Sequence, residues 1–106
     1  MLPFELSVEE FKKMRDAGTP HQLIDCRTPD EFAVSNIGGT LIEMQGIPKH
    51  LDEFDAEDPL IIVCRTGARS AMVTQFLRQN GYPNAQNLAG GIYAWSERID
   101  PAVKKY

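Results

Sequence analysis

The chain has 106 residues, 42% of them hydrophobic, which suits one compact domain spanning residues 1–106. Its formal net charge is −4, which argues against nucleic acids and anionic membranes as main partners, because such partners usually recruit basic proteins. Apolar runs are strand-sized, and the chain does not open on a basic stretch followed by an apolar core. We therefore expect a cytoplasmic protein that does not span a membrane.

The first part of the chain alternates helix and strand signals. Residues 7–10 read as a capping box, and apolar residues then recur at helical spacing until Gly18 ends the helix. Residues 21–25 predict a short strand. Residues 28–31 predict a second helix start, with a capping residue, a proline at the first position and acids in the first turn.

The middle of the chain carries the strongest strand signal. A glycine-containing turn at 36–40 leads to a short strand at 41–42, and residues 47–54 predict a short helix. Residues 60–63 form a continuous apolar run. A strand that is apolar on both faces is typical of the centre of a parallel sheet covered by helices on each side.

Two more helices and a strand complete the pattern. A helix follows Gly67 and ends at 80–81, residues 85–88 predict a strand, and Gly90-Gly91 opens the last helix. Residues expected on the apolar faces are Met72, Val73, Phe76, Leu77, Ile92, Trp95 and Ile99. Alternating strands and helices predict an α/β fold in three layers, a parallel sheet between helices.

The two cysteines point to thiol chemistry rather than to a scaffold. Two are too few for a secreted disulfide framework, and with His21 and His50 they show no zinc-ligand spacing, so we predict no metal site. Cys64 ends the apolar strand, and a loop then leads directly into a helix. Loop amides and a helix N-terminus at that end of a sheet form an anion-binding nest.

A thiol in such a nest ionises more readily, because the helix dipole and nearby Arg65 and Arg69 favour the thiolate, which is the nucleophilic form. Gly67 supplies the left-handed backbone that a tight loop needs. Taken alone, Cys64 would be interpreted as a buried core cysteine. Its combination with Gly67, Arg69 and the following helix favours a nucleophile that accepts a small anionic substrate.

Three stretches of the sequence resemble the rhodanese family, in order and in spacing. They are the loop Cys64-Arg65-Thr66-Gly67-Ala68-Arg69-Ser70, the stretch Leu23-Ile24-Asp25-Cys26-Arg27-Thr28-Pro29-Asp30-Glu31-Phe32, and the closing stretch Asn87-Leu88-Ala89-Gly90-Gly91-Ile92-Tyr93-Ala94-Trp95. The resemblance implies a rhodanese-like α/β domain that moves sulfane sulfur from thiosulfate or a persulfide donor to a thiophilic acceptor. The residues from 99 to 106 also look like rhodanese domains attached to enzymes that activate sulfur-carrier proteins.

The resemblance implies specific roles for the loop. Cys64 is the nucleophile that carries the persulfide, and the amides of Arg65, Thr66, Gly67, Ala68 and Arg69 bind it. We expect no cofactor, because sulfur itself is transferred, and the acceptor is a thiol or a sulfur-carrier protein. Cys26 stands where the family commonly has valine, which favours a buried structural thiol over a resolving one. Asp25 and Arg27, at the end of a strand, allow a catalytic role, but we favour a buried structural ion pair or hydrogen-bond network.

Two other functions remain open. A cysteine phosphatase or arsenate reductase also joins a cysteine to an arginine through an amide-lined loop, but its pattern places five residues between them and this chain has four. The smaller loop favours sulfur over phosphate. The chain also fits a sulfur-relay or regulatory binding module with little turnover of its own, because the same loop serves both roles.

Overall fold

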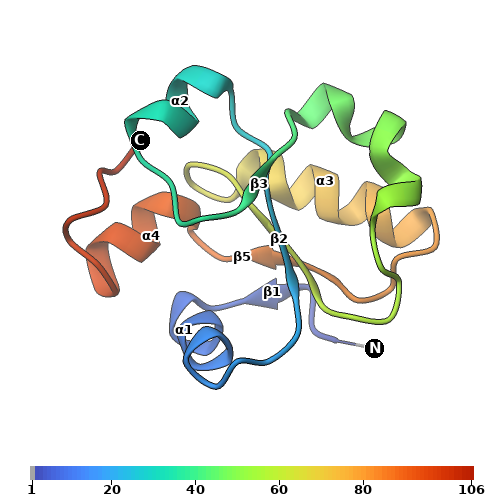
Figure 1. Cartoon of the computed structure of the whole chain (residues 1–106), viewed down its shortest axis with the longest axis horizontal. Helices are drawn as coiled ribbons and strands as arrows, with labels where there is room; N and C mark the ends of the chain where they lie inside the picture. Colours follow the sequence, from blue (N-terminus) through green and yellow to red (C-terminus); the bar gives the residue numbers. More distant parts are fainter. Residues whose placement is uncertain (1) are drawn as a thin grey trace.

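The computed structural model describes residues 2–106, which form a five-stranded parallel sheet between two layers of helices (Figure 1). The strands are β1 (Glu5–Leu6), β2 (Gln22–Asp25), β3 (Thr40–Leu41), β4 (Leu60–Val63) and β5 (Ala85–Leu88), in the spatial order β1-β5-β4-β2-β3. The helices are α1 (Val8–Asp16), α2 (Pro29–Val34), the 3₁₀ helix η1 (Met44–Glu53), α3 (Ala68–Gln79) and α4 (Gly91–Arg98). The predicted three-layer α/β fold is confirmed.

Strand β4 lies at the centre of the sheet, where the sequence placed it. All four of its residues are buried, and it pairs with β2 on one side and β5 on the other. The register with β2 runs from Gln22↔Leu60 to Asp25↔Val63. Because neighbouring parallel strands end at the same edge of the sheet, the residues that follow β2 and β4 emerge side by side.

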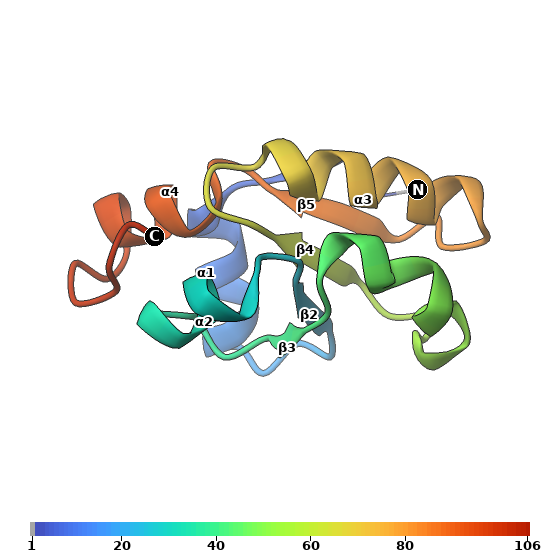
Figure 2. The same cartoon turned by 90° about the horizontal axis from the view of Figure 1, so that it is seen from above.

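The two faces of the sheet divide the core between them. Along β2 and β4 the even-numbered residues, such as Ile24 and Ile62, face a cluster covered by α3 and η1. The odd-numbered residues of β4, Ile61 and Val63, face α1 and α4. This alternation follows from the two-residue period of a strand, and Figures 1 and 2 show the two helical layers on opposite sides of the sheet.

Capping boxes start α1 and α2, as the sequence predicts. The Ser7 hydroxyl accepts a hydrogen bond from the amide of Glu10, whose carboxylate accepts one from the amide of Ser7. Thr28 and Glu31 repeat this arrangement at α2. Within residues 2–106 none of the helices combines the length and the apolar character that crossing a bilayer requires.

Four details differ from the sequence prediction. The segment expected as a helix over 47–54 is a 3₁₀ helix that starts at Met44 and contains Pro48, which cannot donate an α-helical hydrogen bond. Strand β3 begins one residue earlier than expected, at Thr40, and the sequence analysis did not predict β1. Met72, expected on the apolar face of α3, is 65% exposed, whereas Val73 and Leu77 are buried.

A fully buried ion pair closes the carboxyl end of β2. The side chains of Asp25 and Arg27 are both 0% exposed, and the guanidinium binds the carboxylate through Nε and Nη2, the latter at 2.8 Å. The same guanidinium donates to the carbonyls of Ser35, at 2.7 Å, and Tyr106, at 2.8 Å. The predicted buried ion pair is confirmed. In addition, Arg27 joins β2 to the end of α2 and to the C-terminal segment.

We expect Arg27→Met to lower the free energy of unfolding by about 3–5 kcal/mol, because it leaves the Asp25 carboxylate buried without its partner. Urea unfolding followed by the fluorescence of Trp95 measures this loss. The matched control is Arg98→Met, which removes an exposed pair with Glu9 and should cost less than about 1 kcal/mol. Equal losses in the two variants would contradict the structural role of Arg27.

Candidate active site

The sulfur of Cys64 lies where the loop after β4 turns into α3. The residue is 1% exposed, and its Sγ accepts hydrogen bonds from the amide of Gly67 at 3.1 Å, the amide of Ser70 at 3.4 Å and the hydroxyl of Ser70 at 3.2 Å. Three donors thus converge on one sulfur at the N-terminus of a helix. This is the nest that the sequence predicts, and it favours an anionic sulfur.

Gly67 gives the loop its shape. It adopts a φ of 103°, in the left-handed region, and this turn aims its amide at Cys64. Its carbonyl accepts a hydrogen bond from the side-chain amide of Asn87 at 3.2 Å and one from the amide of Ala71 at 3.0 Å. A methyl group on Gly67 would meet the amide nitrogen of Gly90 at 3.3 Å. The loop therefore needs glycine for both conformation and space.

The first turn of α4 holds the loop from its other side. The amides of Ile92 and Tyr93 each donate, at 2.9 Å, to the carbonyls of Cys64 and Arg65. A Cβ at Gly91 would lie 2.3 Å from the carbonyl oxygen of Cys64, so only glycine permits this approach. The Gly90-Gly91 pair, which opens the last helix, thus supports the Cys64 loop.

Cys26 reaches Cys64 across the sheet. Its thiol donates a hydrogen bond to the Cys64 sulfur, and together with the donors from Ser70 and Gly67 this lowers the pKa of Cys64 to about 4 against the opposing effect of burial. The same contact raises the pKa of Cys26 above its usual range, and burial acts in the same direction. In the resting pair Cys64 is therefore the thiolate and Cys26 the protonated thiol.

Arg69 is held by an acidic partner that sequence analysis did not identify. Its Nη1 and Nη2 bind the two carboxylate oxygens of Glu31 at 2.7 and 2.8 Å, which lowers the pKa of Glu31 to about 2. The pair ties the start of α3 to the first turn of α2. These contacts support a structural role for Arg69 rather than attraction of the substrate.

The remaining loop residues line the outer rim. Arg65, Thr66 and Ala68 are exposed, and the guanidinium of Arg65 lies 5.8 Å from the centre of the Tyr106 ring. Arg65 is therefore the loop cation that remains available at the surface. The rim is basic within a chain that is acidic overall.

Ser70 is the residue of this site that the predicted set, Cys64 with residues 65–69, leaves out. It donates to the Cys64 sulfur from both its amide and its hydroxyl. Its position gives a signal, because α3 begins at Ala68 and the first amides of a helix have no partner within the helix. Nothing in the local sequence indicates that Glu31 and Cys26 meet this loop.

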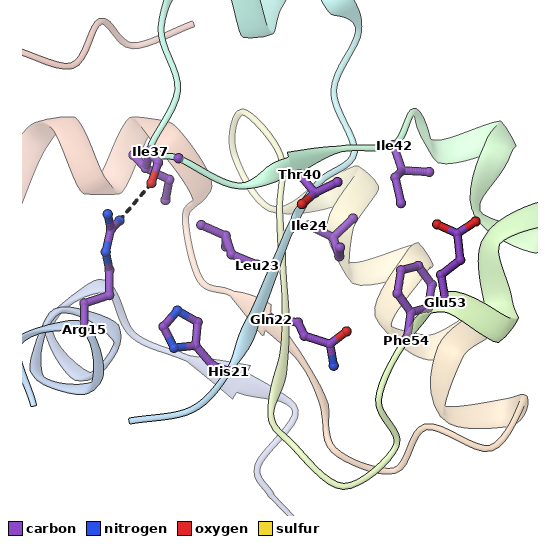
Figure 3. A pocket seen from close by; sticks show the side chains of 11 residues that line it. Arg15, His21, Gln22, Leu23, Ile24, Ile37, Thr40, Ile42, Glu53 and Phe54 are labelled. Atoms are coloured by element: carbon purple, nitrogen blue, oxygen red, sulfur yellow. Dashed lines mark hydrogen bonds between the residues drawn. The ribbon is translucent and has the colours of Figure 1, made fainter. Parts of the chain in front are cut away.

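A cavity of about 640 Å³ lies in another part of the molecule (Figure 3). Residues of α1, β2, β3 and η1 and the segments beside them line it, including His21, Thr40 and Glu53. Its arginine, Arg15, donates a hydrogen bond to the carbonyl of Ile37 at 2.9 Å. The lining side chains supply no thiol, so we place thiol chemistry at the Cys64 loop.

We expect the Cys64 thiolate to persist well below neutral pH. The ultraviolet absorbance difference between the native protein and Cys64→Ser should fall with a midpoint near pH 4 as the sulfur is protonated. Ser70→Ala should raise this midpoint by at least about one unit, because a hydrogen bond to a charged group contributes about 1.5–3 kcal/mol. A midpoint near the ordinary thiol value in the native protein would contradict the geometry.

Similar proteins carry sulfurtransferase names. A sulfurtransferase of Allochromatium vinosum is 40% identical over 82 residues, which cover 76% of this chain and 77% of that protein. The adenylyltransferase and sulfurtransferase MOCS3-2 of Zea mays is 31% identical over 109 residues, covering 95% of this chain and 23% of that protein. The chain spans about a quarter of the length of several such relatives.

Solved structures and a family profile agree with these relatives. A rhodanese-like domain protein of Staphylococcus aureus superposes with a TM-score of 0.81 at 36% identity, over 88% of this chain and 91% of that one. The human single-domain sulfurtransferase TSTD1 gives a TM-score of 0.84 at 26% identity, over 92% and 98%. The profile of the Rhodanese-like domain matches residues 7–98. The chain therefore belongs to the rhodanese-like family of sulfurtransferases.

Proposed function

We propose that the protein carries sulfane sulfur as a persulfide on Cys64 and passes it from thiosulfate or a persulfide donor to a thiophilic acceptor. The observation that carries this proposal is the buried sulfur of Cys64, which accepts hydrogen bonds from the amide of Gly67 and from the amide and hydroxyl of Ser70. A low-pKa thiolate is a nucleophile at neutral pH, and the donors around it also suit the anionic persulfide that follows.

The first step is attack of the Cys64 thiolate on the outer sulfur of the donor. The new bond joins Sγ to that sulfur, and the bond within the donor breaks, so that its electron pair leaves with sulfite or with the donor thiolate. The negative charge moves from Sγ to the added sulfur. The amide of Gly67 and the hydroxyl and amide of Ser70 are the groups placed to stabilise it.

The second step returns the enzyme to its resting thiolate. A nucleophilic acceptor, such as cyanide, a thiol or the carboxyl-terminal group of a sulfur carrier, attacks the outer sulfur and releases the Cys64 thiolate. Because the thiolate is stabilised, it is a good leaving group. Two separate covalent half-reactions imply ping-pong kinetics.

The contacts of Arg69 weigh against the phosphatase alternative. In a loop that holds a phosphate dianion, the arginine at the end of the loop binds the substrate, whereas here both terminal nitrogens of Arg69 bind Glu31. The relay-module alternative differs from free turnover in its partners: Cys64 receives sulfur from a desulfurase and donates it only to a docked protein. It draws support from relatives in which a matching segment makes up about a quarter of a longer protein.

Thiosulfate should add one sulfur, about 32 Da, to the reduced protein, and a reductant should remove it. Intact-mass measurement after removal of excess thiosulfate tests this step. Cyanide should then abolish the added mass as thiocyanate forms. Cys64→Ser should gain nothing. A native protein that neither gains sulfur nor releases sulfide when given thiosulfate or a persulfide donor would overturn the proposed function.

Arg65→Ala should raise the KM for thiosulfate about two- to fivefold with little change in kcat, because an exposed charge contributes up to about 1 kcal/mol. The effect should shrink as salt is added, since ions screen exposed charges. The control is Arg98→Ala, which removes an exposed arginine of α4 that pairs with Glu9. If both variants leave the KM unchanged, Arg65 does not attract the donor.

A further inference from the structure

Cys26 and Cys64 occupy neighbouring positions on two paired strands. The β2–β4 register ends on Asp25↔Val63, and the amide of Cys26 donates to the carbonyl of Val63 at 3.0 Å as part of this last pair. Cys26 and Cys64 are the residues that directly follow this pair on the two strands. Residues paired across neighbouring strands are about 4.8 Å apart, within the range of Cα separations that a disulfide spans.

Both side chains point to the same face of the sheet. Cys26 and Cys64 belong to the core cluster that also holds Ile24 and Ile62, because all four are even-numbered residues of β2 and β4 or their extensions. Cys26 is 2% exposed and Cys64 is 1% exposed. The two side chains thus share one buried cluster, and each is the largest cause of the shift in the other's pKa.

We propose that Cys26 is a second nucleophile, which attacks Sγ of the Cys64 persulfide and expels the outer sulfur as hydrogen sulfide, leaving a Cys26–Cys64 disulfide. This inference rests on the proposed persulfide of Cys64. The persulfide sulfur of Cys64 would then leave the protein by one of two reactions. With an acceptor present it transfers sulfane sulfur, and without one it releases sulfide.

The step balances without an external oxidant. One S–S bond forms between Cys26 and Cys64, and the S–S bond to the outer sulfur breaks. The outer sulfur leaves with the bonding pair and is reduced to sulfide, while the sulfur of Cys26 is oxidised to the disulfide level. The proton of the Cys26 thiol leaves with the departing sulfide. A dithiol reductant then restores both thiols by exchange.

Cys26 gains freedom to react when Cys64 is loaded. In the resting protein its hydrogen is donated to the Cys64 thiolate, which holds Cys26 in its protonated, unreactive form. Adding a sulfur moves the negative charge from Sγ to the outer atom. Sγ is then the atom open to attack, and the negatively charged outer sulfur is the base that accepts the Cys26 proton as the S–S bond between Cys26 and Cys64 forms.

The test follows sulfide release from the loaded protein. Native protein and Cys26→Ala are loaded to completion with thiosulfate, freed of excess reagent and kept without oxygen, acceptor or reductant. The native protein should lose the added sulfur, release one sulfide per chain and end about 2 Da below the reduced mass, as an intramolecular disulfide requires. Cys26→Ala should keep the added sulfur. Cys26→Val, which refills the apolar site, is the second variant if the alanine variant does not fold.

The outcomes separate this inference from the proposed function. If neither protein gains sulfur from thiosulfate, the proposed function fails. Oxidation of the reduced protein with diamide then tests separately whether the Cys26 sulfur can bond to the Cys64 sulfur. The inference requires that a peptide map of the oxidised protein contain an intramolecular Cys26–Cys64 disulfide. A loaded native protein that keeps its sulfur overturns the inference alone. So does equal sulfide release from Cys26→Ala, or a disulfide that links two chains.

Discussion

A negative charge on a sulfur that is almost entirely buried is the constraint around which this molecule is organised. Burial raises the pKa of a thiol unless hydrogen-bond donors offset the loss of water. Here the donors are two backbone amides, one hydroxyl and one thiol, all directed at Cys64. The turn at Gly67, the start of α3 and the residue after strand β2 each contribute a donor, and each of them lowers the pKa of Cys64.

The parallel sheet explains why such a meeting is possible. Strands β2 and β4 end at the same edge, so the segments that follow them are neighbours although 38 positions separate Cys26 from Cys64. The ion pair between Glu31 and Arg69 also connects the segments that follow these two strands, because it joins α2 to α3. The buried Asp25–Arg27 pair fixes the backbone between these two contacts. The segment after β2 is therefore part of the candidate active site, although its residues stand far from the loop in sequence.

Local signals were sufficient for most of the elements and for placing Cys64 in a loop that opens a helix. The capping boxes at Ser7 and Thr28, the apolar run of β4 and the glycine of the loop act within a few residues, and each could be read directly. Strand β1 is only two residues long and exists through its pairing with β5, so local propensity did not reveal it. The contact between Cys26 and Cys64 depends on strand register, and the partner of Arg69 depends on how α2 packs. Neither contact can be predicted from the residues adjacent to it in the sequence.

The support that α4 gives to the loop has a consequence for protein engineering. The carbonyls of Cys64 and Arg65 find their donors in Ile92 and Tyr93, and the helix can come this close only because residue 91 has no side chain. Residues 64–70 are thus half of a two-part unit. Transplanting them onto another sheet would leave two carbonyls without partners, so a functional graft has to carry residues 90–93 as well.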